Sequence, residues 1–124
     1  MPLKLKFFVV LIFAIFLFSK CSYKKSDIAY PATPCDTTGV RLSVELKEIL
    51  TANCFSCHGG EADDAAGIKL ENYDVISRFA LDGTLLSAIT HNGNAVPMPK
   101  GGGKLSDCEI SKFSAWINAG APNN

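Results

Sequence analysis

Two of the five cysteines in this 124-residue chain lie three positions apart, and a histidine follows the second one directly. The segment reads Cys54-Phe55-Ser56-Cys57-His58. Side chains at positions i and i+3 of a helical turn point the same way, so the two thiols would share one face, with the imidazole beside them. The fold must therefore present two thiols and one imidazole at one surface.

The spacing Cys-x-x-Cys-His is typical of the covalent attachment of a c-type haem. Two thiols on one face can add to the two vinyl groups along one edge of the haem, and the adjacent histidine can then reach the iron. We therefore predict one covalently bound haem c, attached through Cys54 and Cys57, with His58 as the proximal iron ligand.

Zinc binding and thiol redox chemistry are alternatives, because Cys-x-x-Cys also occurs in both kinds of site. A structural zinc site needs four ligands, and His91, Cys35 and Cys108 show no second paired spacing with His58. A thioredoxin-like site lies within a βαβ pattern, which this sequence does not show. The sequence therefore favours haem over both.

Met98 is the predicted distal iron ligand, because it is the only methionine besides the initiator and stands between two prolines. The prolines restrict φ and stiffen this segment, which would hold the thioether toward the iron. His91 is the rival ligand and would give bis-histidine coordination with a lower potential. Two filled axial positions predict a low-spin haem that transfers electrons; a haem enzyme or sensor would need a displaceable sixth ligand.

The spacing of apolar residues predicts an all-α domain with long loops and no strand. We expect helices over 44–53, with Ser43 as N-cap, over 72–79 and over 84–90, and a last helix that follows a capping box of Ser106 and Glu109. Residues 59–71 and 92–104 are predicted loops. Seven apolar residues are candidates to surround the iron: Ile68, Leu70, Leu85, Leu86, Ile89, Phe113 and Trp116.

Residues 1–20 are predicted to be a signal peptide, because Lys4 and Lys6 precede an unbroken run of 12 apolar residues. That run is shorter than the roughly 20 apolar residues that a membrane-spanning helix needs. Cys21 follows it and resembles the lipid acceptor of a bacterial lipoprotein, although Lys20 departs from the usual small residue. Residues 21–39 would then be a lipidated N-terminus and flexible tether, and residues 40–124 the folded domain.

The charge of the chain argues against a nucleic-acid partner, because 12 Lys and Arg residues balance 12 Asp and Glu residues. Three of the cations lie within residues 1–20, so the remainder is mildly acidic. We expect an exported protein at the periplasmic or cell-envelope face, held at a membrane by its N-terminal lipid.

The order of these motifs resembles that of class I-type single-haem cytochromes c, in the exported bacterial lipoprotein form. Cys54 to His58, the Met98-Pro99 loop and a last helix with Trp116-Ile117 carry the resemblance over about residues 40–122. It implies a helical haem cage in which the first and last helices pack together, with axial ligation by His58 and Met98. It also implies a monomeric one-electron carrier of an extracytoplasmic respiratory chain, served by redox partner proteins.

Packing of the first and last helices would bring Cys35 and Cys108 close to each other. An exported compartment permits a disulfide between them, and the alternative is two separate thiols. The bond would stabilise the fold by roughly 4 kcal/mol through the chain entropy of the loop that it closes.

Overall fold

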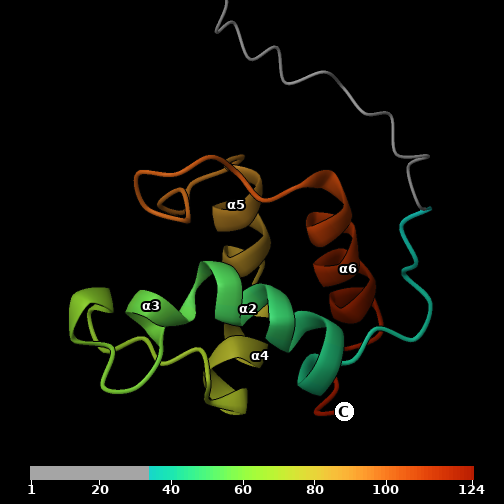
Figure 1. Ribbon diagram of the computed structural model, residues 1–124, viewed down its shortest axis with the longest axis horizontal. Helices are drawn as coiled ribbons and strands as arrows, with labels where there is room; N and C mark the ends of the chain where they lie inside the picture. The colour runs from blue at the N-terminus through green and yellow to red at the C-terminus, as the bar shows by residue number, and fades with distance from the viewer. Residues whose placement is uncertain (1–33) are drawn as a thin grey trace, which may run out of the picture. The chain divides into compact units, whose positions relative to one another are not determined.

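The computed structural model describes residues 34–124 (Figure 1). The predicted signal peptide, Cys21 and most of the predicted tether lie outside the described residues. The described chain forms helical elements joined by loops and contains no strand, which confirms the all-α prediction. The elements are η1 (Leu42–Leu46), α2 (Lys47–Asn53), α3 (Phe55–His58), η2 (Asp63–Ala65), α4 (Tyr73–Leu81), α5 (Thr84–Thr90) and α6 (Asp107–Asn118). Across residues 34–124, every helix falls short of the length and apolar character that a membrane crossing needs.

The first helical stretch begins earlier than predicted and has a different cap. η1 is a wide turn in which the N–H of Leu46 donates to the carbonyl of Arg41, and it continues into α2. The prediction of Ser43 as N-cap is wrong, because Ser43 lies inside η1. The amides of Leu42 and Ser43 instead donate to the side chain and the carbonyl of Asn124, at 2.8 and 2.9 Å. A contact from the far end of the chain therefore replaces a local cap.

The later helices begin and end close to the predicted positions. The side chain of Asn72 accepts the N–H of Asp74 and caps α4, which ends two residues later than predicted. The predicted bounds of α5 are confirmed. Ser106 and Glu109 form the predicted capping box of α6, with the Ser106 N–H donating to the Glu109 carboxylate at 2.8 Å.

The apolar core lies where α6 contacts η1 and α5, and where α4 contacts α5 (Figure 1). Leu46, Phe113 and Trp116 are completely buried there. The indole Nε1 of Trp116 donates to the carbonyl of Pro122 at 2.8 Å and ties the segment after α6 to the core. The expected packing of the first and last helices is thus present.

The structure brings Cys35 and Cys108 together at the start of α6. Their Cα atoms lie 5.5 Å apart, although the residues are 73 positions apart in the sequence. The structure thus pairs the two cysteines that the sequence predicts to be partners.

Candidate functional site

A largely apolar cavity of about 500 Å³ contains all four residues predicted to hold haem. Cys54, Cys57 and His58 line it from the α2–α3 region, and Met98 lines it from the loop after α5. This volume lies in the range of sites for small molecules and cofactors. The remaining lining residues are Asn53, Asp64, Ala65, Ala66, Ile68, Leu70, Phe79, Thr84, Leu85, Ala88, Ile89, Ala95, Val96, Pro99, Lys100 and Leu105.

The apolar wall of the cavity agrees only partly with the sequence prediction. Ile68, Leu70, Leu85 and Ile89 line it as expected. Leu86, Phe113 and Trp116 do not, because Phe113 and Trp116 are completely buried in the core and Leu86 packs against it. Sequence reasoning missed Phe79 and several alanines, among them Ala65, Ala66, Ala88 and Ala95. Helical periodicity selects large apolar residues for a core, and it gives no signal for small residues that leave room for a ligand.

The two cysteines of the motif differ in exposure. Cys54 lies between α2 and α3 and is half-buried, whereas Cys57 is exposed. Burial, with a smaller contribution from the Glu109 carboxylate, raises the pKa of the Cys54 thiol to about 11. Cys54 is therefore protonated at neutral pH in the unmodified chain.

His58 is held in one tautomer by the loop that follows α3. Its Nδ1 lies 2.9 Å from the carbonyl oxygen of Ile68, and the N–H of Leu70 donates back to the carbonyl of His58 at 2.9 Å. A carbonyl only accepts, so Nδ1 carries the hydrogen, and in the neutral imidazole the lone pair is then on Nε2. This arrangement leaves Nε2 free to bind a metal and orients the ring.

Met98 and His91 occupy different places, although they are close in sequence. Met98 is half-buried and lines the cavity, and its N–H donates to the carbonyl of Ala88 at 3.0 Å. His91 is exposed and is not part of the cavity wall. Its Nε2 lies 3.0 Å from the carbonyl oxygen of Met98. Of the two rival ligands, only Met98 therefore lines the cavity.

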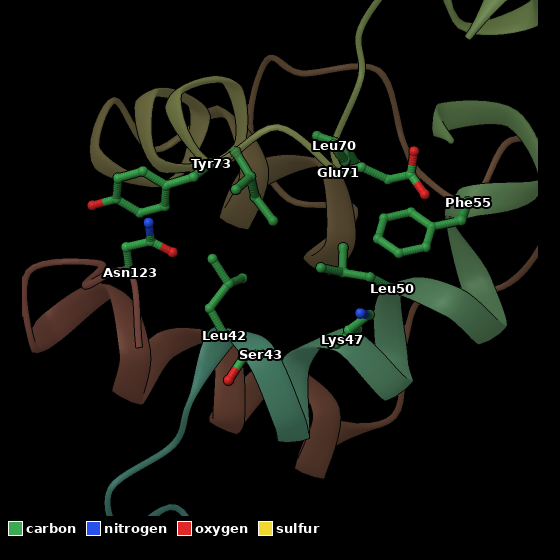
Figure 2. A pocket seen from close by; sticks show the side chains of 10 residues that line it. Leu42, Ser43, Lys47, Leu50, Phe55, Leu70, Glu71, Tyr73 and Asn123 are labelled. Atoms are coloured by element: carbon green, nitrogen blue, oxygen red, sulfur yellow. The ribbon is translucent and has the colours of Figure 1, made fainter. Parts of the chain in front are cut away.

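A second, smaller cavity of about 240 Å³ is lined by one residue of the motif, Phe55. Figure 2 shows the side chains of Leu42, Leu50, Phe55 and Tyr73 arranged around it. Phe55 belongs to this cavity, whereas its neighbour Cys54 belongs to the larger one, and Leu70 lines both. Within the motif, Cys54, Cys57 and His58 thus line the larger cavity, Phe55 lines the smaller one, and Ser56 lines neither.

The donor set of the larger cavity fits a haem better than a metal ion alone. Two cysteines, one histidine and one methionine line the same mostly apolar space. Thioether sulfur and imidazole are the axial ligands of many cytochromes c. Within residues 34–124, three or more His, Cys, Asp or Glu side chains do not gather as an ion site would require.

Comparison with known proteins agrees with this fit. Residues 44–117, more than half of the chain, match the family described as cytochrome C oxidase, cbb3-type, subunit III. Cytochrome c6 of Bryopsis maxima is 30% identical over 73 residues, which cover 56% of this chain and 82% of that protein. Cytochrome c6 of Picosynechococcus sp. is 32% identical over 85 residues, which cover 62% of this chain and 72% of that protein. No solved structure gives a significant match. The chain therefore belongs to this family, as a single-haem cytochrome c domain that carries covalently attached haem c and transfers electrons rather than catalysing the conversion of a substrate.

Proposed function

We propose that Cys54 and Cys57 form the two thioether bonds to the haem, and that His58 and Met98 are its axial ligands. The observation that carries the proposal is the single cavity lined by these four side chains. A haem held by these residues would supply one-electron chemistry at its iron. The domain would take electrons from one redox partner protein and give them to another.

The protein would orient the His58 ring toward the iron and limit the access of water to the haem. The Ile68 carbonyl holds the His58 ring with Nε2 directed away from the loop. Apolar side chains such as Leu85 and Ile89 exclude water from the cavity and favour the less charged ferrous form. Two protein ligands leave no open position for a substrate, which suits a carrier.

Covalent attachment is tested by haem staining of the mature protein on denaturing gels. We expect the stain in the wild type and its loss in Cys54→Ser/Cys57→Ser. The matched control is Cys35→Ser/Cys108→Ser, which removes the other cysteine pair. We expect this variant to keep the haem stain. A wild type that carries no stain, or a stain that survives loss of Cys54 and Cys57, refutes the attachment.

Axial ligation by Met98 is tested by absorption spectroscopy of the oxidised protein. A thioether bound to ferric iron gives a far-red sulfur-to-iron band, and we expect this band in the wild type. Met98→Ala should abolish the band while the haem stain remains. Survival of the band in Met98→Ala would contradict the assignment.

The cellular setting is proposed from the N-terminal sequence. Residues 1–20 would direct export, Cys21 would carry lipid, and residues 21–39 would tether the domain of residues 40–124 to a membrane as a monomer. An extracytoplasmic respiratory chain is the setting that fits a haem c carrier of this kind. Cys21→Ala should move the protein from the membrane fraction to the soluble envelope fraction. Unchanged membrane association would refute the lipid anchor.

A further inference from the structure

We infer that His91 is a positioning residue for the Met98 ligand: its ring donates a hydrogen bond to the Met98 carbonyl and holds the thioether at the cavity. This inference rests on the proposed ligation by Met98. Nothing in the sequence marks His91 for such a role, because its imidazole first suggests a rival iron ligand.

The peptide groups on both sides of the Met98 Cα atom are bound to the end of α5. The Met98 N–H donates to the carbonyl of Ala88 at 3.0 Å. The Met98 carbonyl lies 3.0 Å from Nε2 of His91, and because a carbonyl only accepts, Nε2 must carry the hydrogen. The Met98 N–H is thus bound by the backbone of α5. Among the described residues, His91 is the only one whose side chain forms a hydrogen bond with the Met98 carbonyl.

The backbone of His91 directs its ring toward this carbonyl. His91 ends α5 in the left-handed region, at φ 56° and ψ 31°. This conformation is uncommon for residues other than glycine, and Asn, Asp and His adopt it more readily than most. The chain therefore turns back after α5, and the side chain of His91 contacts Met98, seven positions later in the loop.

Other residues of the loop are held to α5 by hydrogen bonds to Ser87. The Ala95 N–H donates to Oγ of Ser87 at 3.2 Å, and the Asn92 N–H donates to the Ser87 carbonyl at 3.3 Å. These contacts hold the start and the middle of the loop. His91 acts at Met98 itself, so its loss should loosen the ligand more than the loop.

The test compares variants that separate the ring from the backbone conformation. His91→Gly keeps the left-handed turn and removes the ring, whereas His91→Gln keeps a side-chain N–H donor. Cyanide competes with Met98 for ferric iron, so its affinity reports how firmly the thioether is held. We expect His91→Gly to bind cyanide about three- to tenfold more tightly than the wild type, the effect of one lost hydrogen bond. His91→Gln should recover part of the difference.

Two further measurements separate positioning from general stability. The Met98 amide should exchange its hydrogen faster in His91→Gly, because the peptide group next to it is released. The matched control is Tyr73→Phe, which removes a side-chain bond of the same length to the Ala121 carbonyl, at 3.0 Å, away from the larger cavity. Tyr73→Phe should lower the thermal midpoint and leave cyanide affinity unchanged.

The outcomes distinguish this inference from the proposed ligation. A wild type without the far-red band refutes ligation by Met98, and the positioning role fails with it. A wild type with the band, together with unchanged cyanide affinity and amide exchange in His91→Gly, refutes the positioning role alone. Equal cyanide effects in His91→Gly and Tyr73→Phe also refute it, because general destabilisation would then suffice.

Discussion

The Nδ1 atom of His58 lies 2.9 Å from the carbonyl oxygen of Ile68, ten positions further along the chain. The loop that delivers this carbonyl turns at Gly67, whose φ of +74° lies in the left-handed region. The orientation of the His58 imidazole, the proposed iron ligand, therefore depends on loop 59–71 as much as on α3. If His58 binds the iron as proposed, this dependence links a backbone conformation in the loop to the electronic properties of that ligand.

Gly67→Ala should lower stability and raise the reduction potential together. A Cβ atom at Gly67 would meet no neighbour within 4 Å, so its cost of about 1–2 kcal/mol comes from the positive φ alone. A displaced Ile68 carbonyl would accept a weaker hydrogen bond from His58, which lowers the basicity of the ligand and favours ferrous iron. Urea unfolding and redox titration measure the two effects. The control is Gly39→Ala, where φ is +59° and space is equally open; it should change stability only.

Ser106→Ala should lower the free energy of unfolding by about 1 kcal/mol, because it removes the cap of α6. The Ser106 hydroxyl accepts the N–H of Glu109 at 3.3 Å and donates to its carboxylate at 2.7 Å. Ser111→Ala is the matched control, since its hydroxyl bonds only to the carbonyl of Asp107 within the same helix. Equal urea midpoints for the two variants would contradict this role of Ser106.

Removal of the Cys35–Cys108 pair should destabilise the fold without changing the haem spectrum. The two residues lie 73 positions apart, and a bond between them would contribute roughly 4 kcal/mol by chain entropy. The double serine variant should therefore unfold at lower denaturant concentration, with the same visible bands. Thiol labelling of the unreduced, unfolded wild type gives an independent check: modification of both cysteines would show that no bond forms.

Trp116→Phe should cost about 2 kcal/mol of stability and leave the reduction potential unchanged. The smaller ring leaves a void in a completely buried site. It also removes the indole N–H that donates to the carbonyl of Pro122 at 2.8 Å, so that carbonyl loses its hydrogen bond. Trp116 does not line the larger cavity, so the iron should not sense the change. A clear shift of potential would instead place Trp116 in the haem environment.

The contribution of Glu45 to stability should disappear in acid. Hydrogen bonds from the side chain and the backbone N–H of Arg41 lower the pKa of the Glu45 carboxyl from 4.5 to about 2. A lowered folded-state pKa gives stability that is present above pH 4.5 and is lost as the pH falls toward 2. The effect is small, because the pair is exposed to solvent. Glu45→Gln should unfold more easily than the wild type at pH 6, and the difference should shrink as the pH approaches 2.

The helices and the candidate haem motif could be predicted from the sequence because their signals are local. The capping box of Ser106 and Glu109 and the periodicity of residues 84–90 each depend on neighbours within one or two turns. Ser43 failed as an N-cap because Asn124, which is distant in sequence, satisfies the amides that a local cap would serve. Trp116 and Leu85 have similar local patterns and are both buried in the core, yet only Leu85 also lines the larger cavity. Only the tertiary arrangement separates them.

The haem motif is not a structurally independent unit, because the helix that leads to it begins at a contact with Asn124. Asn124 accepts hydrogen bonds from the amides of Leu42 and Ser43, and it is 82 positions from Leu42. No residue beyond Leu105 lines the larger cavity. Transplanting Cys54–His58 into another protein would therefore carry over the thiols and the imidazole but leave behind the residue that secures the helix leading to them.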